Sequence, residues 1–171
     1  MKLIHCADIH LDSPMQTHMT AQQASVRNTE MLQSFVRLTE FAQERAVRAI
    51  LIAGDLFDGA RVRARTVDAL LAAIRRTPEV DYLYLPGNHD EAANAFCDCA
   101  LPENLKVFGK KWTTYRYDGI VISGAQLGLD AAFYEALPHT DGAVNLVMLH
   151  GGIGTACAED VINLKLLKNR G

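Results

Sequence analysis

The chain has 171 residues, a length that suits one domain and allows a sizeable buried core. Hydrophobic residues make up 49% and charged residues 22%, which excludes the composition of a disordered chain. The net charge of −3 is not the strongly basic balance that nucleic-acid-binding domains normally carry. Any role on DNA must therefore be argued from particular residues rather than from overall charge.

Apolar runs and helical spacings alternate through the first half of the chain. We predict strands at 3–6, 49–53 and 82–85, and helices at about 28–46 and 67–74. The continuous apolar run at 49–53 is typical of a strand that is buried on both faces. This alternation predicts parallel strands joined by crossover helices, in a single α/β domain that covers residues 1–171.

The second half has shorter elements. We predict strands at 105–108, 112–117, 120–123 and 144–149, of which the last is a buried run. Asp118-Gly119 lies between two of these strands and indicates a hairpin. A closing helix is predicted at 160–169.

The cysteines and the chain start indicate a cytoplasmic protein without a membrane association. The four cysteines (Cys6, Cys97, Cys99 and Cys157) form no C-x-x-C pair, so we expect reduced thiols rather than a disulfide or a zinc site. No apolar run approaches the ~18 residues of a membrane span. Met1-Lys2 leads directly into a predicted strand, which leaves no room for a signal peptide.

Polar residues follow the ends of four predicted strands. The carboxyl ends of parallel strands meet at one edge of a sheet, so residues far apart in sequence are expected to converge there. The residue types are those that divalent metal ions prefer as ligands. The four segments are Asp8-Ile9-His10, Gly54-Asp55-Leu56-Phe57-Asp58, Gly87-Asn88-His89-Asp90 and His150-Gly151.

These side chains predict a site for two divalent metal ions. Asp8 and His10 can bind one ion together, Asp55 can bridge both ions, and Asn88 with His150 can bind the second. Two bridged ions lie about 3.5–4 Å apart and lower the pKa of a bound water, which can then attack a phosphate ester. The predicted chemistry is therefore metal-assisted hydrolysis of a phosphate ester.

Three neighbouring polar residues have supporting or uncertain roles. His89 can steady phosphoryl oxygens or protonate the leaving oxygen, and Asp58 can orient the imidazole of His89. Asp90 is a weaker candidate, because it can simply cap a helix that starts near residue 91. The arginines at 61, 63 and 65 are interpreted as a solvated helix start.

The motifs resemble those of calcineurin-like metallophosphoesterases, whose pattern is D-x-H, G-D-x-x-D, G-N-H-D/E, H and finally G-H-x-H. Within that family, the segments 7–14 (ADIHLDSP) and 51–58 (LIAGDLFD) are similar to DNA repair exonucleases of the SbcD type. The resemblance implies a four-layer α/β/β/α sandwich that acts on DNA ends. It also implies manganese as the usual metal, with iron, zinc or magnesium as alternatives, and an ATPase partner related to SbcC. The resemblance is also compatible with a homodimer.

One motif of the pattern is missing. The sequence contains no G-H-x-H, which normally gives one histidine to each metal, and no DNA-capping region. We therefore expect a C-terminally incomplete catalytic core in which metal occupancy is partial.

Three functions stay open on the sequence. The first is the catalytic core of a metal-dependent DNA exonuclease. The second is a phosphatase or phosphodiesterase that acts on a small molecule, which the negative net charge favours slightly. The third is a non-catalytic partner-binding module, against which the intact motif residues argue.

Overall fold

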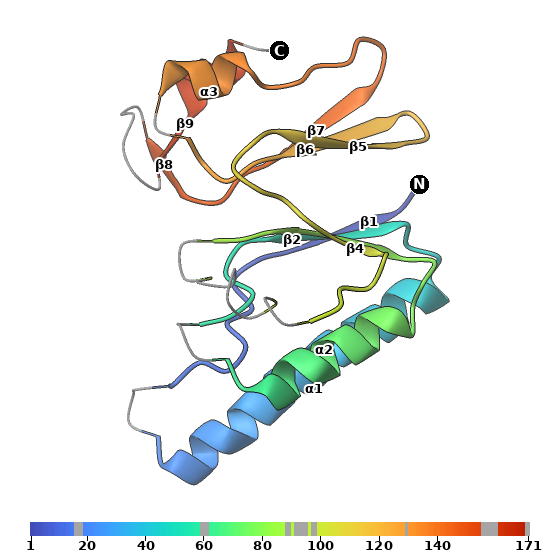
Figure 1. Cartoon of the computed structure of the whole chain (residues 1–171), viewed down its shortest axis with the longest axis vertical. Coiled ribbons are helices and arrows are strands. Elements are labelled where there is room, and N and C mark those ends of the chain that lie inside the picture. Colours follow the sequence, from blue (N-terminus) through green and yellow to red (C-terminus); the bar gives the residue numbers. More distant parts are fainter. Residues whose placement is uncertain are drawn as a thin grey trace.

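The computed structural model of the chain describes residues 1–15, 19–58, 62–87, 90, 96, 99–128, 130–154 and 161–169 (Figure 1). Its elements are, in chain order, β1 (Leu3–Cys6), α1 (Ala21–Glu44), β2 (Ala49–Ala53), α2 (Ala64–Arg75), β3 (Asp81–Leu85), β4 (Leu105–Val107), β5 (Thr113–Tyr117), β6 (Ile120–Gly124), α3 (Ala131–Glu135), β7 (Val144–Met148), β8 (Gly152–Gly154), β9 (Val161–Asn163) and α4 (Leu164–Lys168). No helix among the described residues is long and apolar enough to cross a membrane.

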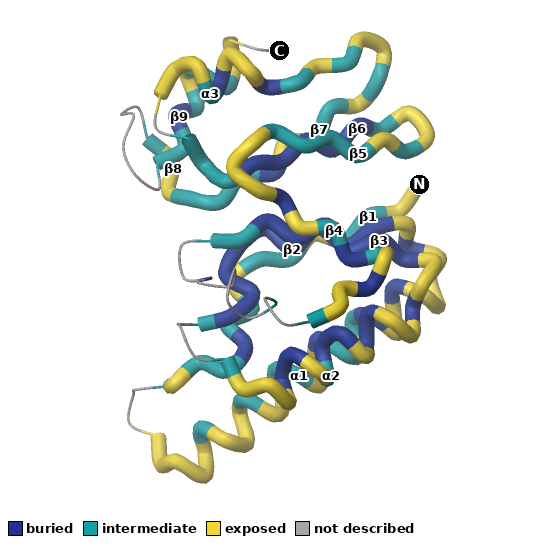
Figure 2. Tube along the Cα trace, viewed as in Figure 1, coloured by how far each residue is buried: buried dark blue, intermediate teal, exposed yellow. Residues whose placement is uncertain are grey.

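The first half of the chain forms a parallel four-stranded sheet in the order β1-β2-β3-β4. The predicted strands at 3–6 and 49–53 are confirmed, and the third strand begins one residue earlier than predicted. All five residues of β2 are buried, as the apolar run at 49–53 predicted, and so are all five residues of β3 (Figure 2). The carboxyl ends of β1, β2 and β3 therefore lie together at one edge, where the polar motifs begin.

Helices α1 and α2 cover the outer face of this sheet (Figure 1). Phe35 and Ala42 of α1 and Leu70 and Ile74 of α2 are buried against it. Helix α1 starts at residue 21 rather than 28, because a capping box at Thr20 begins the helix before its apolar spacing becomes visible.

The second half of the chain forms a second sheet that packs on the inner face of the first. Strands β5 and β6 form the predicted hairpin, in which Gly119 has a φ of +71°, and β7 runs parallel to β6. An apolar cluster lies between the two sheets and includes Leu51, Leu83, Phe108 and Ile122. With α3 on the outer side of the second sheet, the predicted four-layer α/β/β/α arrangement is confirmed (Figure 1).

Two predictions about the last elements were wrong. Val144 and Val147 are 58% and 36% exposed, so β7 is not a buried run; in the described sheet it is an edge strand. The first part of the predicted closing helix is strand β9, which pairs with β8. The helix begins only after Asn163, whose side chain accepts hydrogen bonds from the amides of residues 165 and 166 at 3.1 Å each.

The cysteine prediction can be followed at two of the four positions. Cys6 and Cys99 carry free thiols, whereas Cys97 and Cys157 lie outside the described residues. Burial raises the pKa of Cys6 to about 11, which keeps its thiol protonated and unreactive near neutral pH.

The carboxylate of Asp81 joins the two sheets at the edge opposite the polar motifs. It accepts hydrogen bonds from Lys106 at 3.0 Å and from the Tyr117 hydroxyl at 2.9 Å, and it pairs with Arg48 at 3.0 Å. Burial, together with the hydrogen bond and the charge of Asp81, raises the pKa of Tyr117. Since Tyr117 belongs to β5 and the other three residues lie on the first sheet or beside it, this cluster fixes one sheet against the other.

We predict that Asp81→Asn lowers the free energy of unfolding by about 1–3 kcal/mol, because two cations lose the charge of a nearly buried partner. Urea denaturation followed by circular dichroism measures the change. Asp68→Asn, at an exposed position of α2, is the matched control and should change stability by less than about 0.5 kcal/mol. Equal effects of the two substitutions would mean that Asp81 does not join the sheets.

Candidate metal centre

The loops that follow β1, β2 and β7 meet beside the carboxyl edge of the first sheet. Ligand atoms of Asp8, Asp55 and His150 all lie within 4.8 Å of one another. Asp8 follows β1, Asp55 follows β2 and His150 follows β7, so the cluster joins both sheets. The fold thereby brings residues 8 and 150 together in one small group of side chains, all of types that bind metal ions.

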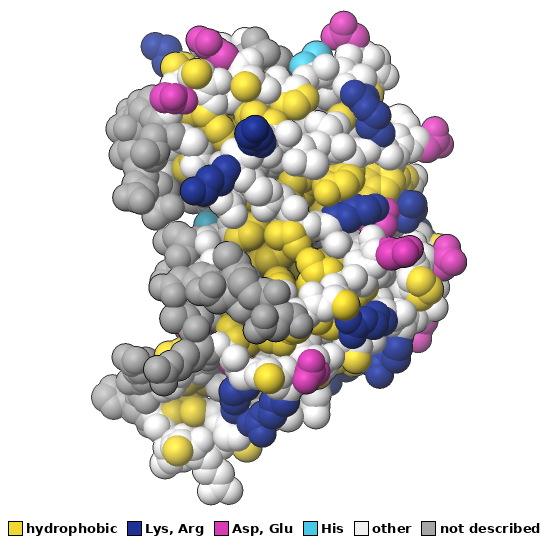
Figure 3. Space-filling model, in the orientation of Figure 1, with side chains coloured by type: hydrophobic (Ala, Val, Ile, Leu, Met, Phe, Trp, Pro, Cys, Tyr) yellow, Lys and Arg dark blue, Asp and Glu magenta, His cyan; other side chains and the backbone are white. Residues whose placement is uncertain are grey.

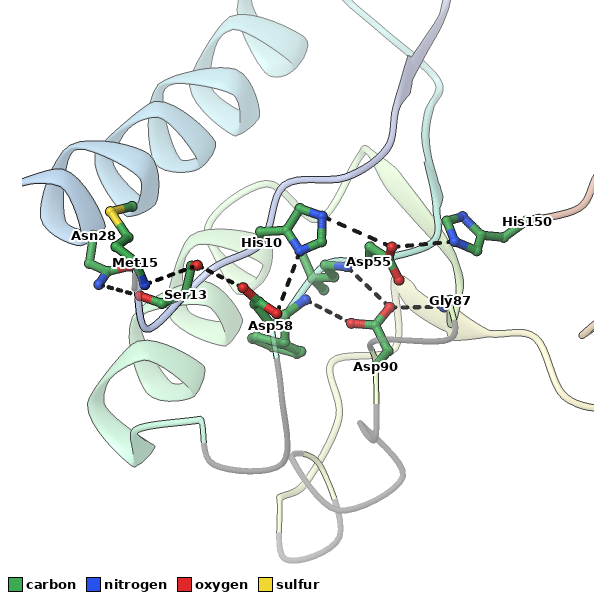
Figure 4. Close-up of polar contacts among 11 residues, drawn as sticks. His10, Ser13, Met15, Asn28, Asp55, Asp58, Gly87, Asp90 and His150 are labelled. Carbon is green, nitrogen blue, oxygen red and sulfur yellow. Dashed lines mark hydrogen bonds and ion pairs between the residues drawn. The ribbon is translucent and has the colours of Figure 1, made fainter. Parts of the chain in front are cut away.

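Asp55 is the centre of this group. Its Oδ2 atom lies 3.4 Å from Nε2 of His150 and 4.0 Å from Nε2 of His10 (Figure 4). The residue is only 4% exposed, whereas the side chains of His10 and His150 are 32% and 16% exposed. One carboxylate between two imidazoles is the arrangement that a bridging ligand requires.

The tautomer of His150 follows from its second contact. Its Nδ1 atom lies 3.0 Å from the carbonyl oxygen of Ala53. A carbonyl can only accept a hydrogen bond, so Nδ1 carries the proton and donates it. In the neutral imidazole with this proton, the lone pair of Nε2 lies on the side of Asp55, where a metal ion can use it.

The loop that carries Asp8 and His10 runs alongside the loop that carries Asp55. The amide of Asp8 donates to the carbonyl of Gly54 at 3.2 Å, and the amide of His10 donates to the carbonyl of Asp55 at 2.9 Å. A β-bridge between Leu11 and Phe57 continues the pairing. Backbone hydrogen bonds thus fix where the predicted ligands stand relative to one another.

This pairing needs left-handed backbone at residues other than glycine. Asp8, His10, Asp12 and Asp55 have φ values of 52°, 50°, 62° and 49°. Such conformations cost about 1–2 kcal/mol for an ordinary residue and less for Asp. Strained positions of this kind concentrate at functional sites, where the surrounding structure holds them in place.

Two glycines allow the ligand side chains to approach closely. A Cβ atom on Gly54 would lie 2.0 Å from Nδ1 of His150, and one on Gly87 would lie 2.2 Å from Oδ1 of Asp55. The Gly-Asp and Gly-Asn pairs of the sequence are therefore more than turn signals. Each glycine leaves the space that a neighbouring ligand occupies.

Asp90 makes contacts that the sequence did not predict, and the helix that it was expected to cap lies outside the described residues. Its carboxylate accepts hydrogen bonds from the amides of Leu56 at 3.1 Å, Phe57 at 2.7 Å and Gly87 at 2.9 Å. The residue is 8% exposed, and residues 91–95 lie outside the described part of the chain. Asp90 therefore ties the loop after β2 to the loop after β3 (Figure 4).

Arg63 does not belong to a purely solvated helix start. Its backbone amide and its guanidinium both donate to the carboxylate of Asp12, whose side chain is 3% exposed. Burial alone would raise the pKa of Asp12, but the hydrogen bonds and charge of Arg63 hold it below its ordinary value. This pair fixes the end of the His10 loop to the start of α2, and Arg61 lies outside the described residues.

The remaining predicted site residues are only partly placed. Asp58 lies beside the site, with Oδ1 at 4.0 Å from Nδ1 of His10 and its amide donating to the carbonyl of Leu11 at 3.2 Å. Asn88 and His89 lie outside the described residues. Their predicted roles, as a metal ligand and as the catalytic histidine, therefore stay predictions.

The residues present fit a divalent metal ion. Two carboxylates and two imidazoles are hard and borderline donors of the kind that manganese, iron or zinc binds. A carboxylate as buried as that of Asp55 is costly without positive charge nearby, and a divalent ion supplies such charge. The motifs did not reveal the residues that support these donors, chiefly Asp12, Asp90 and the two glycines.

The contact between Gly54 and His150 makes a testable prediction. Gly54→Ala should displace the imidazole and weaken Mn²⁺ binding at least tenfold, since its Cβ would overlap the ring. Gly119→Ala is the matched control, because Gly119 also has a positive φ but has open space around it. The positive φ alone costs each variant about 1–2 kcal/mol of stability, and the overlap with His150 adds to this cost in Gly54→Ala. Equal Mn²⁺ affinity in the two variants, measured by isothermal titration, would contradict the close approach.

A second prediction concerns Asp90. Asp90→Asn should lower the free energy of unfolding by about 2 kcal/mol, because one of its two accepting oxygens becomes an amide group that faces a backbone N–H. Urea denaturation of the metal-free protein measures this change, with exposed Asp68→Asn as control. A stability equal to that of the unsubstituted chain would show that Asp90 does not hold the two loops together.

Comparison with known proteins shows the family to which the chain belongs. The family model of calcineurin-like phosphoesterases matches residues 1–169. The uncharacterized metallophosphoesterase YhaO of Bacillus subtilis (strain 168) is 30% identical over 112 residues, which cover 63% of this chain and 28% of that protein. The DNA double-strand break repair protein Mre11 of Methanopyrus kandleri is 30% identical over 95 residues, which cover 53% of this chain and 19% of that protein. The aligned region is thus less than a third of either relative.

Among solved structures, the Pseudomonas putida nuclease MPE is similar with a TM-score of 0.35 and 17% identity, over 70% of this chain and 52% of that one. The family assignment depends on the family model, which spans nearly the whole chain, and its expected metal chemistry agrees with the cluster of Asp8, Asp55 and His150. The chain therefore belongs to the calcineurin-like phosphoesterases, a family of metal-dependent hydrolases.

Proposed function

We propose that this chain is the nuclease core of a DNA repair exonuclease that hydrolyses DNA phosphodiester bonds at a two-metal centre. The observation that carries the proposal is the position of Asp55, whose Oδ2 faces both His10 and His150 while Asp8 lies within reach of the same group. This is the donor set of two adjacent cation positions that share one carboxylate.

Each donor has a proposed assignment. Asp8 and His10 hold one ion, Asp55 bridges, and His150 with Asn88 holds the other. Divalent ions held by these residues would supply positive charge to phosphoryl oxygens and would lower the pKa of a bound water. The chain itself orients the donors, through Ala53 for His150 and through backbone pairing for Asp8 and His10. His89 is proposed to act on the leaving oxygen, with Asp58 as its supporting carboxylate.

DNA is the proposed substrate for two reasons. The segments 7–14 and 51–58 resemble SbcD-type exonucleases, and one relative is by name a DNA double-strand break repair protein. By the same resemblance we propose manganese as the metal and an ATPase related to SbcC as the partner, while a homodimer stays open. The net charge of −3 favours a small phosphate ester instead, so that substrate is the second candidate.

A cleavage assay separates these candidates. The chain with 1 mM Mn²⁺ is given end-labelled duplex DNA and, separately, bis-p-nitrophenyl phosphate and p-nitrophenyl phosphate. We expect DNA shortening that EDTA abolishes and that Asp55→Asn reduces at least a hundredfold, because its bridging charge is lost. Hydrolysis of the small esters without any DNA cleavage would favour the second candidate. Mn²⁺ binding without hydrolysis of any substrate would favour a non-catalytic module.

A further inference from the structure

The segment that joins β4 to β5 is anchored at both of its ends. At its start, Phe108 is 1% exposed in the apolar cluster between the sheets, and the carbonyl of Gly109 accepts a hydrogen bond from the amide of Gln126 at 2.9 Å. At its end, the ring of Trp112 stacks on the ring of Phe133 in α3, with the ring centroids 4.8 Å apart, and Trp112 Nε1 donates to the Phe133 carbonyl at 2.8 Å. These contacts fix the position of the backbone between the two anchors.

The residues between the anchors are Lys110 and Lys111, and both are exposed. Neither ammonium group pairs with an acidic side chain in the part of the chain that the structure describes. Asp130, at the start of α3, accepts a hydrogen bond from the amide of Phe133 at 2.9 Å and caps that helix. Figure 3 shows Lys and Arg side chains on the part of the molecule that the second sheet forms. The charges of the two lysines are thus available to an anionic partner.

The strand register places this segment at the same edge as the candidate metal centre. Thr113 of β5 pairs with Gly124 of β6, which in turn pairs with Met148 of β7, so the three residues form one row across the second sheet. Lys111 comes two residues before Thr113, and His150 comes two residues after Met148. Because β5 runs antiparallel to β7, both positions lie beyond the same side of the row. Neighbouring strands lie about 4.8 Å apart, so the row spans roughly 10 Å.

Positive charge is scarce at this edge. The carboxylates of Asp8 and Asp55 lie in the candidate metal centre and repel phosphate groups when no cation is bound. Arg63, which precedes α2 at the same edge, is already paired with the carboxylate of Asp12. The whole chain carries a net charge of −3, so its surface as a whole does not attract a polyanion. A polyanion that reaches the site therefore needs a local cationic contact, which the two lysines supply.

We propose that Lys110 and Lys111 bind the phosphate backbone of DNA and hold a strand beside the metal centre. Two neighbouring ammonium groups on an anchored segment suit a chain of phosphates, whereas a small ester offers a single anionic group. Contacts to phosphates fix the position of a strand but do not select its sequence. The value of this contact for catalysis rests on the proposed function, while the binding itself requires no metal ion.

Fluorescence anisotropy with a short fluorescein-labelled DNA duplex tests the contact. EDTA is present so that no cleavage occurs, and affinity is measured from about 50 to about 200 mM NaCl. The double variant Lys110→Gln with Lys111→Gln should bind about tenfold more weakly at the lowest salt. The slope of log affinity against log salt should fall by up to about 1.8, because each lost phosphate contact removes about 0.9. Duplexes of different sequence should be affected equally.

The double variant Arg45→Gln with Arg76→Gln is the matched control. It removes the same charge from exposed positions at the ends of α1 and α2, beside the amino ends of the strands and away from the metal centre. It should leave the salt slope unchanged, and circular dichroism checks that both variants are folded. Equal losses in the two double variants, no loss in the lysine variant, or no DNA binding by the unsubstituted chain would overturn the proposal.

Two further arms identify the partner and separate the proposal from the proposed function. If the lysines determined the binding of labelled poly-L-glutamate but not of DNA, the partner would be an acidic protein and the proposal would be wrong. If the lysine variant loses DNA binding as expected, but the unsubstituted chain with Mn²⁺ cleaves no DNA, the nuclease function fails and the DNA contact stands. Cleavage of DNA with binding that is independent of the lysines would have the opposite meaning.

Discussion

The site depends on the backbone pairing between the loop after β1 and the loop after β2. Three amides of residues 8–11 donate to carbonyls of residues 54–56 at 2.9–3.2 Å, beyond the end of the regular strands. This pairing requires positive φ values at Asp8, His10 and Asp55. It sets the separation of the predicted ligands before any side-chain contact is considered, so the side-chain supports only adjust an arrangement that the backbone has already fixed.

The residues at the two ends of the strands of the first sheet have opposite effects on the stability of the folded chain. At the carboxyl ends, beside the candidate metal centre, the nearly buried carboxylate of Asp55 and the residues with left-handed backbone raise the free energy of the folded chain. At the far edge, Asp81 binds Arg48, Lys106 and Tyr117 and joins the sheets. A strained site persists only where other contacts hold the structure in place. The contacts of Asp81 at the opposite ends of the strands are of this kind.

The sequence predicted the frame of the fold and the edge of the sheet at which the candidate donors meet, for identifiable reasons. Apolar runs such as 49–53 are visible without partners, and residues that follow parallel strands must meet at one edge. The exposure of Val144 could not be predicted in this way, because it depends on which strand lies beside β7. Nor could the strand at 161–163, which exists through its pairing with β8.

The supports of the site were equally hidden from sequence patterns. Asp90 binds amides of residues 56 and 57, more than thirty positions away, and Asp12 binds Arg63 across 51 positions. A carboxylate that accepts from backbone amides gives no compositional signal, since any residue can supply the donor.

The structure also shows that the two histidines have different neighbours at Nδ1. The carbonyl of Ala53, which no substitution removes, holds His150, whereas Nδ1 of His10 lies 4.0 Å from the side-chain carboxylate of Asp58. The orientation of His150 is therefore tied to the backbone, whereas a substitution at position 58 changes the surroundings of His10.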